Sequence, residues 1–75
     1  VMLDFSKEVA PYVETKPLHP SQKSEWVDGK LRVMIEVIPN YELESLILSF
    51  GEKVKVEKPV NLAKLIKERL KLAID

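Results

Sequence analysis

Apolar side chains recur along this chain with two periods, and each period marks a different kind of element. A period of two, typical of a strand with one buried face, occurs in four stretches. The predicted strands are residues 1–5, 21–27, 30–38 and 53–57. Pro39 and Pro59 follow the last two stretches and end them, because proline cannot donate a hydrogen bond to a neighbouring strand.

A period of 3.6 marks three helices between and after these strands. Ser6 is a favourable N-cap for the first helix, and Pro11 lies too far inside it to be a first-turn proline, so we expect a short or kinked helix. Asn40 and Asn61 are the expected N-caps of the other two, and Gly51 is the expected C′ residue of the second. The predicted inward residues are Val9, Tyr12 and Val13, then Leu43, Leu46, Ile47 and Phe50, then Leu62, Leu65, Ile66, Leu70 and Ala73.

The dipeptide Asp28-Gly29 predicts a two-residue hairpin turn of type I′, which requires positive φ at both residues. The turn sets the register as Val27 opposite Lys30, Trp26 opposite Leu31, Glu25 opposite Arg32, Ser24 opposite Val33 and Lys23 opposite Met34. Opposed residues share a face, so Trp26 is expected to point into the core and not to stack on a ligand. Polar Gln22 and Ser24 on the core side indicate that residues 21–27 form an edge strand.

The element order is therefore β-α-β-β-α-β-α, which predicts a single α+β domain over residues 1–75. The simplest right-handed arrangement is a ferredoxin-like β-α-β-β-α-β sheet with helices on one face and an additional C-terminal helix. Residues 1–5 and 30–38 would be the central strands. The other face would be open, and would present Met2, Asp4, Arg32, Met34 and Glu36.

Composition narrows the function classes. The chain has 75 residues, of which 45% are hydrophobic, enough for one core but with little room for an internal ligand cavity. Cysteine is absent, which excludes disulfides and thiolate metal sites and fits a cytoplasmic location. No apolar run approaches the ~20 residues that a membrane span needs. Because the chain opens with Val1 inside a strand pattern, we expect it to be part of a longer protein.

His19 is the only histidine, and the sequence offers it neither a nucleophile on a glycine-rich turn nor further metal ligands. We therefore favour a structural or recognition role for His19 over a catalytic one. Ser21 and Gln22 are expected to satisfy backbone groups beside the prolines, or to contact a partner. The sequence predicts no catalytic residues, no metal and no cofactor.

The basic residues near the C-terminus are the candidate nucleic-acid contacts. They are Lys53, Lys55, Lys64, Lys67 and Lys71. Such lysines can meet phosphates, but they are also typical of a solvated helix face, and we favour the second interpretation. The formal net charge of zero argues against a dedicated nucleic-acid module.

Two tetrads carry a resemblance that spans the whole chain. They are His19-Pro20-Ser21-Gln22 and Leu48-Ser49-Phe50-Gly51. With Asp4-Phe5-Ser6, Asp28-Gly29, Glu42-Leu43, residues 54–59 and Leu62 in the same order, the chain resembles the WCX domain, the C-terminal extension of WYL-domain bacterial transcriptional regulators. It departs from the family where Leu46-Ile47 stand in place of an aromatic residue in the second helix.

The resemblance implies a non-enzymatic domain that helps a regulator to dimerise and to respond to an effector, either a small molecule or nucleic acid. The implied partners are the winged-helix and WYL domains of the same full-length chain and a second copy in a homodimer. Two other classes remain open, namely a small-molecule sensor of ferredoxin-like fold and a structural accessory domain of an enzyme. The predicted contact surface comprises Met2, Arg32 and Met34 on the open sheet face and His19, Ser21 and Gln22 before the hairpin.

Overall fold

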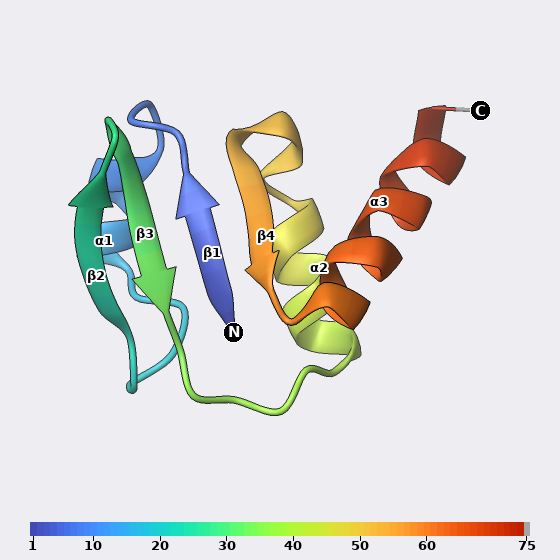
Figure 1. Ribbon diagram of the computed structural model, residues 1–75, viewed down its shortest axis with the longest axis horizontal. Helices are drawn as coiled ribbons and strands as arrows, with labels where there is room; N and C mark the ends of the chain where they lie inside the picture. Colours follow the sequence, from blue (N-terminus) through green and yellow to red (C-terminus); the bar gives the residue numbers. More distant parts are fainter. Residues whose placement is uncertain (75) are drawn as a thin grey trace.

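The computed structural model describes residues 1–74 and shows helices and strands in nearly the predicted order (Figure 1). The elements are β1 (Met2–Phe5), α1 (Ala10–Thr15), β2 (Lys23–Val27), β3 (Lys30–Met34), α2 (Tyr41–Leu48), the 3₁₀ helix η1 (Gly51–Lys53), β4 (Val54–Lys58) and α3 (Val60–Ile74). The predicted α+β class and the C-terminal helix are confirmed.

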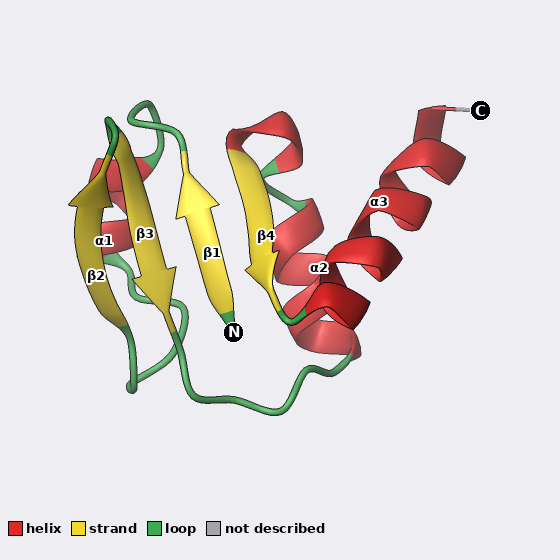
Figure 2. Cartoon of the chain, viewed as in Figure 1, coloured by secondary structure: helices red, strands yellow, loops and turns green. Residues whose placement is uncertain are grey.

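The four strands form one sheet in the order β2-β3-β1-β4, and every neighbouring pair is antiparallel. The predicted central strands, β1 and β3, do lie in the middle, and β2 and β4 are at the edges. Helices α1 and α2 lie behind the sheet in the view of Figure 2, and no helix of the described residues covers the front. We call that uncovered side the open face.

The core lies between the sheet and the helices, because β1 and β3 place every second side chain on that side. Its buried hydrophobic residues are Leu3, Phe5, Ala10, Val13, Leu31, Val33, Ile35, Leu43, Ile47, Val56, Leu62 and Ile66. Phe5 also meets the ring of Phe50 edge to face, with the centroids 5.0 Å apart, which ties the central strand to the segment after α2.

The hairpin register is confirmed pair by pair, from Val27 opposite Lys30 to Lys23 opposite Met34. Asp28 and Gly29 have φ values of 51° and 80°, as a type I′ turn requires. Three of the strands are shorter than predicted, whereas β4 has the predicted length and is shifted by one residue, from 53–57 to Val54–Lys58. β2 begins at Lys23 and not at residue 21, and β3 ends at Met34 and not at residue 38.

Trp26 is 56% exposed, so the prediction that it points into the core is wrong. Its register is as expected, but register decides only the face. Burial also requires a layer of side chains above that face. β2 lies at the sheet edge, and α1, the helix on this side, has only six residues. All residues of β2 are consequently exposed or half-buried.

The first helix is short, as predicted, but its start was misplaced. α1 begins at Ala10, and Pro11 lies in its first turn, where a missing backbone N–H removes no helical hydrogen bond. Ser6 does not cap this helix. Its carbonyl accepts a hydrogen bond from the Val9 N–H, 3.1 Å, in a turn that precedes the helix. Tyr12 is 56% exposed, in place of the predicted inward position.

The ends of α2 and α3 agree only in part with the predicted caps. Asn40 caps α2 as predicted, and its Oδ1 accepts from the Leu43 N–H at 2.8 Å. The C-cap of α2 is Ser49, so the C′ position is Phe50, and Gly51, predicted to be C′, lies one residue further on. Its φ of 56° still favours glycine. Helix α3 begins at Val60, so Asn61 lies inside the helix and is not its N-cap.

Helix α3 is held mainly through its first turns. Leu62 and Ile66 are 3% and 4% exposed, whereas Leu72 is 74% exposed and Ala73, predicted to face inward, is exposed. Figure 1 shows the C-terminal half of α3 extending away from the sheet. Leu46 and Leu65, also predicted inward, are about one-third exposed, at 37% and 38%.

Helices α2 and α3 are joined by a polar clamp. The Arg69 guanidinium lies 5.1 Å from the centroid of the Tyr41 ring, and its Nη1 is 3.3 Å from Oε1 of Glu44. The arrangement combines a cation–π contact with a partly exposed ion pair. It joins the first turn of α2 to the second half of α3, beyond the buried residues Leu62 and Ile66.

We expect Gly29→Val to destabilise the domain by about 1–3 kcal/mol, because a β-branched residue resists positive φ. A Cβ atom at this position would meet no atom within 4 Å apart from its chain neighbours, so the effect is expected to come from the backbone. Urea denaturation measures it, with Gly29→Asn as the control because asparagine tolerates this conformation. Equal denaturation midpoints for the two variants would contradict the explanation.

Candidate functional site

The segment His19–Gln22, which precedes β2, is fixed by hydrogen bonds of its own side chains. The Ser21 backbone N–H donates to Nδ1 of His19 at 3.1 Å, and the Ser21 hydroxyl lies 2.7 Å from the same nitrogen. Because Nδ1 accepts, the proton of the neutral ring is on Nε2. Ser21 Oγ also accepts from the Glu36 N–H at 2.8 Å, which joins this segment to the chain after β3.

Gln22 connects the same segment to α1. Its Oε1 accepts from the Leu18 N–H at 2.8 Å, and its Nε2 donates to the Val13 carbonyl at 3.3 Å. The expectation that Ser21 and Gln22 satisfy backbone groups is confirmed. Together, the side chains of His19, Ser21 and Gln22 hold a proline-containing connector against the helix before it and against the chain that follows β3.

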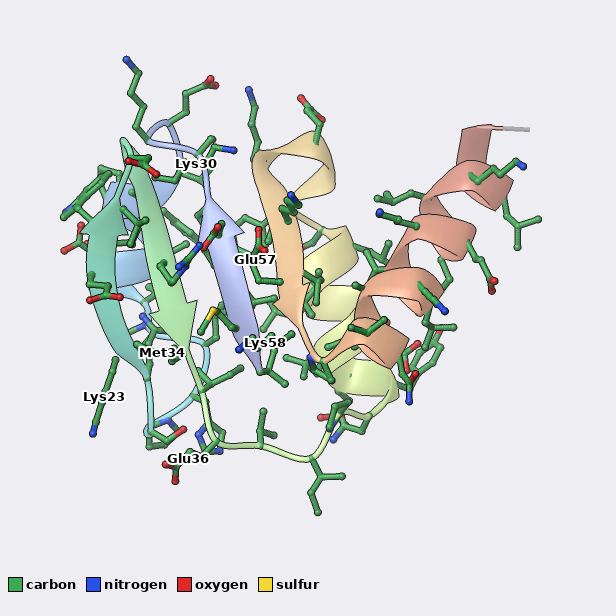
Figure 3. The ribbon with its side chains drawn as sticks, viewed as in Figure 1. Lys23, Lys30, Met34, Glu36, Glu57 and Lys58 are labelled. Atoms are coloured by element: carbon green, nitrogen blue, oxygen red, sulfur yellow. The ribbon has the colours of Figure 1, made fainter. Side chains whose placement is uncertain are left out.

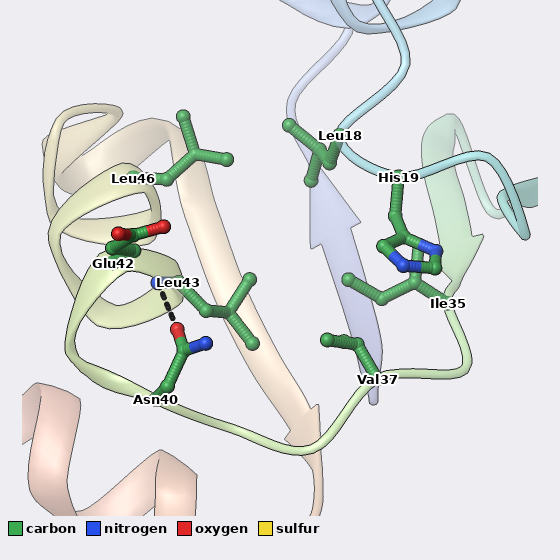
Figure 4. Close-up of a pocket in the computed structure, with 8 residues that line it drawn as sticks. All are labelled: Leu18, His19, Ile35, Val37, Asn40, Glu42, Leu43 and Leu46. Carbon is green, nitrogen blue, oxygen red and sulfur yellow. Dashed lines mark hydrogen bonds between the residues drawn. The ribbon is translucent and has the colours of Figure 1, made fainter.

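A groove with a volume of about 200 Å³ lies between His19 and the start of α2 (Figure 4). It is lined by Leu18, His19, Ile35, Val37, Asn40, Glu42, Leu43 and Leu46. Most of these side chains are apolar. The polar ones are the His19 ring on one side and Asn40 and Glu42 on the other. We call this hollow the His19 groove.

On the open face, Arg32 holds Asp4 by a two-pronged ion pair. Arg32 Nε lies 2.9 Å from Oδ1 of Asp4, and Nη2 lies 3.0 Å from Oδ2. The hydrogen bond from Arg32 lowers the pKa of Asp4, against burial, which acts to raise it. The same bond raises the pKa of Arg32. The Arg32 side chain thus binds a carboxylate on β1 and not that of Glu25, its opposite residue on β2.

A second hollow, of about 350 Å³, lies at one end of the open face. It is lined by Val1, Met2, Ser21, Lys23, Met34, Ile35, Glu36 and Lys58. Met2 and Met34 are directly opposed on β1 and β3. In Figure 3, Lys23 lies on the β2 side of the sheet, Lys58 on the β4 side, and Met34 between them. We call this site the open-face hollow.

The residues of the predicted contact surface thus do not form one site in the structure. It brings Met2 and Met34 together with Ser21 in the open-face hollow, whereas His19 lines the His19 groove. Arg32 lines neither hollow and is occupied by Asp4.

Sequence reasoning missed Lys23 and Lys58 as residues of this hollow. The hairpin register already placed Lys23 opposite Met34, which was a usable signal. Lys58 reaches Met2 through the β1–β4 pairing, where the register shifts between Met2 and Leu3. The sequence carries no turn that fixes this pairing, so nothing in it pointed to Lys58.

The candidate nucleic-acid lysines do not share one environment. The Lys53 amine binds the Glu8 carboxylate, which lowers the pKa of Glu8 and raises that of Lys53. Lys55 pairs with Glu57 at 3.5 Å. The remaining three, Lys64, Lys67 and Lys71, are exposed on α3. A role in nucleic-acid binding stays a prediction for all five.

Within residues 1–74, no cluster of three or more histidine, cysteine or acidic side chains is arranged to hold a metal ion. None of the described helices combines the length and the apolar character needed to cross a bilayer.

The sequence pattern over almost the whole given chain identifies its family. Residues 1–74 match the family described as the WCX domain. The chain belongs to this family. No curated protein matches the chain. In this WCX domain the tetrad His19–Gln22 is now seen to be a hydrogen-bonded connector, and Leu48–Gly51 contains the end of α2 and the ring that packs on Phe5.

We expect Asp4→Asn to lower the free energy of unfolding by about 1–2 kcal/mol at neutral pH, since Arg32 loses its charged partner. The pKa of Asp4 is lower in the folded state, so its stabilisation is complete above the unfolded pKa of about 3.9. It declines as the pH falls through the folded pKa. Urea titrations of the wild type and the variant should therefore converge in acid. A difference that stays constant with pH would contradict this account, and Glu14→Gln on α1 is the control.

Ser21→Ala should cost about 1 kcal/mol, because the Glu36 N–H and His19 Nδ1 both lose the hydroxyl. Thermal or urea denaturation measures the change. Ser24→Ala, at an exposed position of β2, is the matched control and should cost less. If both variants have the same stability, the hydroxyl does not hold the connector.

Proposed function

We propose that this WCX domain is a non-enzymatic accessory domain of a bacterial transcriptional regulator of the WYL family. In that protein it would help two copies to dimerise and would transmit the binding of an effector, which is a small molecule or nucleic acid. The observation that carries the proposal is the family match over residues 1–74. A DNA-bound regulator works in the cytoplasm, which is the location we propose.

We also propose that the fold is ferredoxin-like. The support is the strand order β2-β3-β1-β4 with every pair antiparallel, together with a helix between β1 and β2 and another between β3 and β4. In such an arrangement the helices occupy one face, and the open face is available for contacts.

The open-face hollow is the surface that we propose for contact with another domain of the regulator or with its effector. Met2 and Met34 form an apolar floor of flexible side chains, which adapt to a partner's shape. Lys23, Lys58 and Glu36 supply a charged rim, which favours a defined orientation of the partner. Ser21 connects this floor to the segment that lines the His19 groove.

The test is Met34→Asp in the full-length regulator that contains this chain. A charge on the apolar floor should reduce the effector response, measured with a reporter gene, by at least about tenfold. Glu14→Lys, at an exposed position of α1, is the matched control and should leave the response unchanged. A wild-type response from the Met34→Asp regulator would exclude the open-face hollow as the contact surface.

The His19 groove supports a second candidate, a small-molecule sensor. Its apolar walls carry a hydrogen-bond donor at His19 Nε2 and a carboxylate at Glu42, which suits a small ligand with both polar and apolar parts. The single histidine provides a specific readout, because binding would shift its ring resonances in an NMR titration. Small metabolites that leave these resonances unmoved while the regulator still responds to them would exclude the groove.

A further inference from the structure

The outer edge of β2 is available for pairing with another strand. β2 is the last strand on one side of the sheet, and Figure 1 shows no element of the described chain beyond it. Its residues are exposed or half-buried, and Trp26 is 56% exposed. A free edge with an exposed aromatic residue resembles an interface without its partner.

The hydrogen-bond pattern identifies which backbone groups face outward. Ile35 exchanges both backbone hydrogen bonds with Val1, each 2.9 Å long. Since bonded residues alternate along an antiparallel strand, the odd-numbered residues of β3 bond β1 and the even-numbered ones bond β2. Arg32 therefore bonds Glu25 through the backbone, and the N–H and C=O groups of Ser24 and Trp26 point away from the sheet.

We propose that this edge pairs with the same edge of a second copy, antiparallel and around a twofold axis at Ser24. Outward-facing residues must then bond outward-facing residues, which leaves few registers. In the register centred on Ser24, Lys23 lies opposite Glu25 of the other copy, and Glu25 lies opposite its Lys23. These pairs are the closely spaced, non-hydrogen-bonded ones, so opposite charges meet twice across the axis.

The competing registers lack this complementarity. Pairing Ser24 with Trp26 of the other copy places Glu25 against Glu25, and like charges directly opposite each other repel. Centring the axis on Trp26 leaves both charged residues without a charged partner. The spacing of Lys23 and Glu25 on one face of the edge strand thus selects one register and one occupant, a second copy of this chain.

The pairing would unite two sheets into one, with both open faces on the same side. This inference rests on the proposed function only for the role that the dimer would have in the regulator. The edge shares with the open-face hollow just one residue, Lys23. Failure of the pairing and failure of the open-face function can therefore be observed separately.

The test uses the 75-residue chain, whose single tryptophan lies in the proposed interface. Sedimentation equilibrium from about 10 µM to about 1 mM should show a weak monomer–dimer equilibrium, because the interface is small. The emission of Trp26 should shift to shorter wavelength as the dimer forms. A chain that stays monomeric over this range would overturn the proposal.

Charge reversal then tests the register. Glu25→Lys places like charges opposite each other twice, and it should raise the dimer dissociation constant at least about tenfold. The double variant Lys23→Glu, Glu25→Lys restores opposite charges and should return the constant to within about threefold of wild type. Glu36→Lys makes the same charge change outside the edge and should have little effect.

Ser24→Pro tests the backbone contacts without new charges. Its N–H points outward, so proline removes a bond to the second copy while leaving the β2–β3 bonds in place. Circular dichroism and urea denaturation check that the variants remain folded. Met2→Asp, which changes the open-face hollow on β1, two strands away from this edge, should leave the dimer unchanged. A dimer that resists both Glu25→Lys and Ser24→Pro would show that another surface mediates it.

Discussion

The requirement for positive φ at Asp28 and Gly29 is the constraint on which the rest of this domain depends. Only one turn type satisfies it between two antiparallel strands, and that turn fixes which residues face each other across β2 and β3. A slip of one residue would move Leu31 and Val33 to solvent and carry Arg32 into the core. The Asp4–Arg32 pair and the methionine floor depend on the same assignment of faces along β3, because the β1–β3 pairing sets Asp4 opposite Arg32 and Met2 opposite Met34.

The parts of the fold that local rules decide could be predicted from the sequence. The hairpin register, the cap at Asn40 and the central positions of β1 and β3 follow from turn chemistry, side-chain oxygens and apolar alternation. Trp26 could not be placed correctly, because its burial depends on how far a helix extends over the sheet. Nor could the start of α1 be found, since Pro11 fits a first turn as well as it breaks a helix interior.

In the candidate site, too, some features follow from local rules and others depend on the tertiary path of the chain. Met2 and Met34 were predicted to share the open face, and the β1–β3 pairing sets them side by side. Their meeting with Ser21 depends on the path of the chain after α1, and that path is fixed by the amide of Gln22 and the imidazole of His19. The sequence of His19–Gln22 suggested a recognition motif. In the structure, these side chains first of all hold the connector in place through hydrogen bonds. The same hydrogen bonds determine where these side chains reach the surface.

Helix α3 illustrates how unevenly a small domain distributes its stability. Its first turns pack on β4 and α2 through Leu62 and Ile66, whereas Leu72 and Ala73, towards its other end, are exposed. Short helices without tertiary packing are marginal in water, so the helix should open from its far end while its base stays closed. Amide protons would record this as a gradient of exchange along a single helix. The far turns can therefore change conformation on contact with another surface without disturbing the sheet.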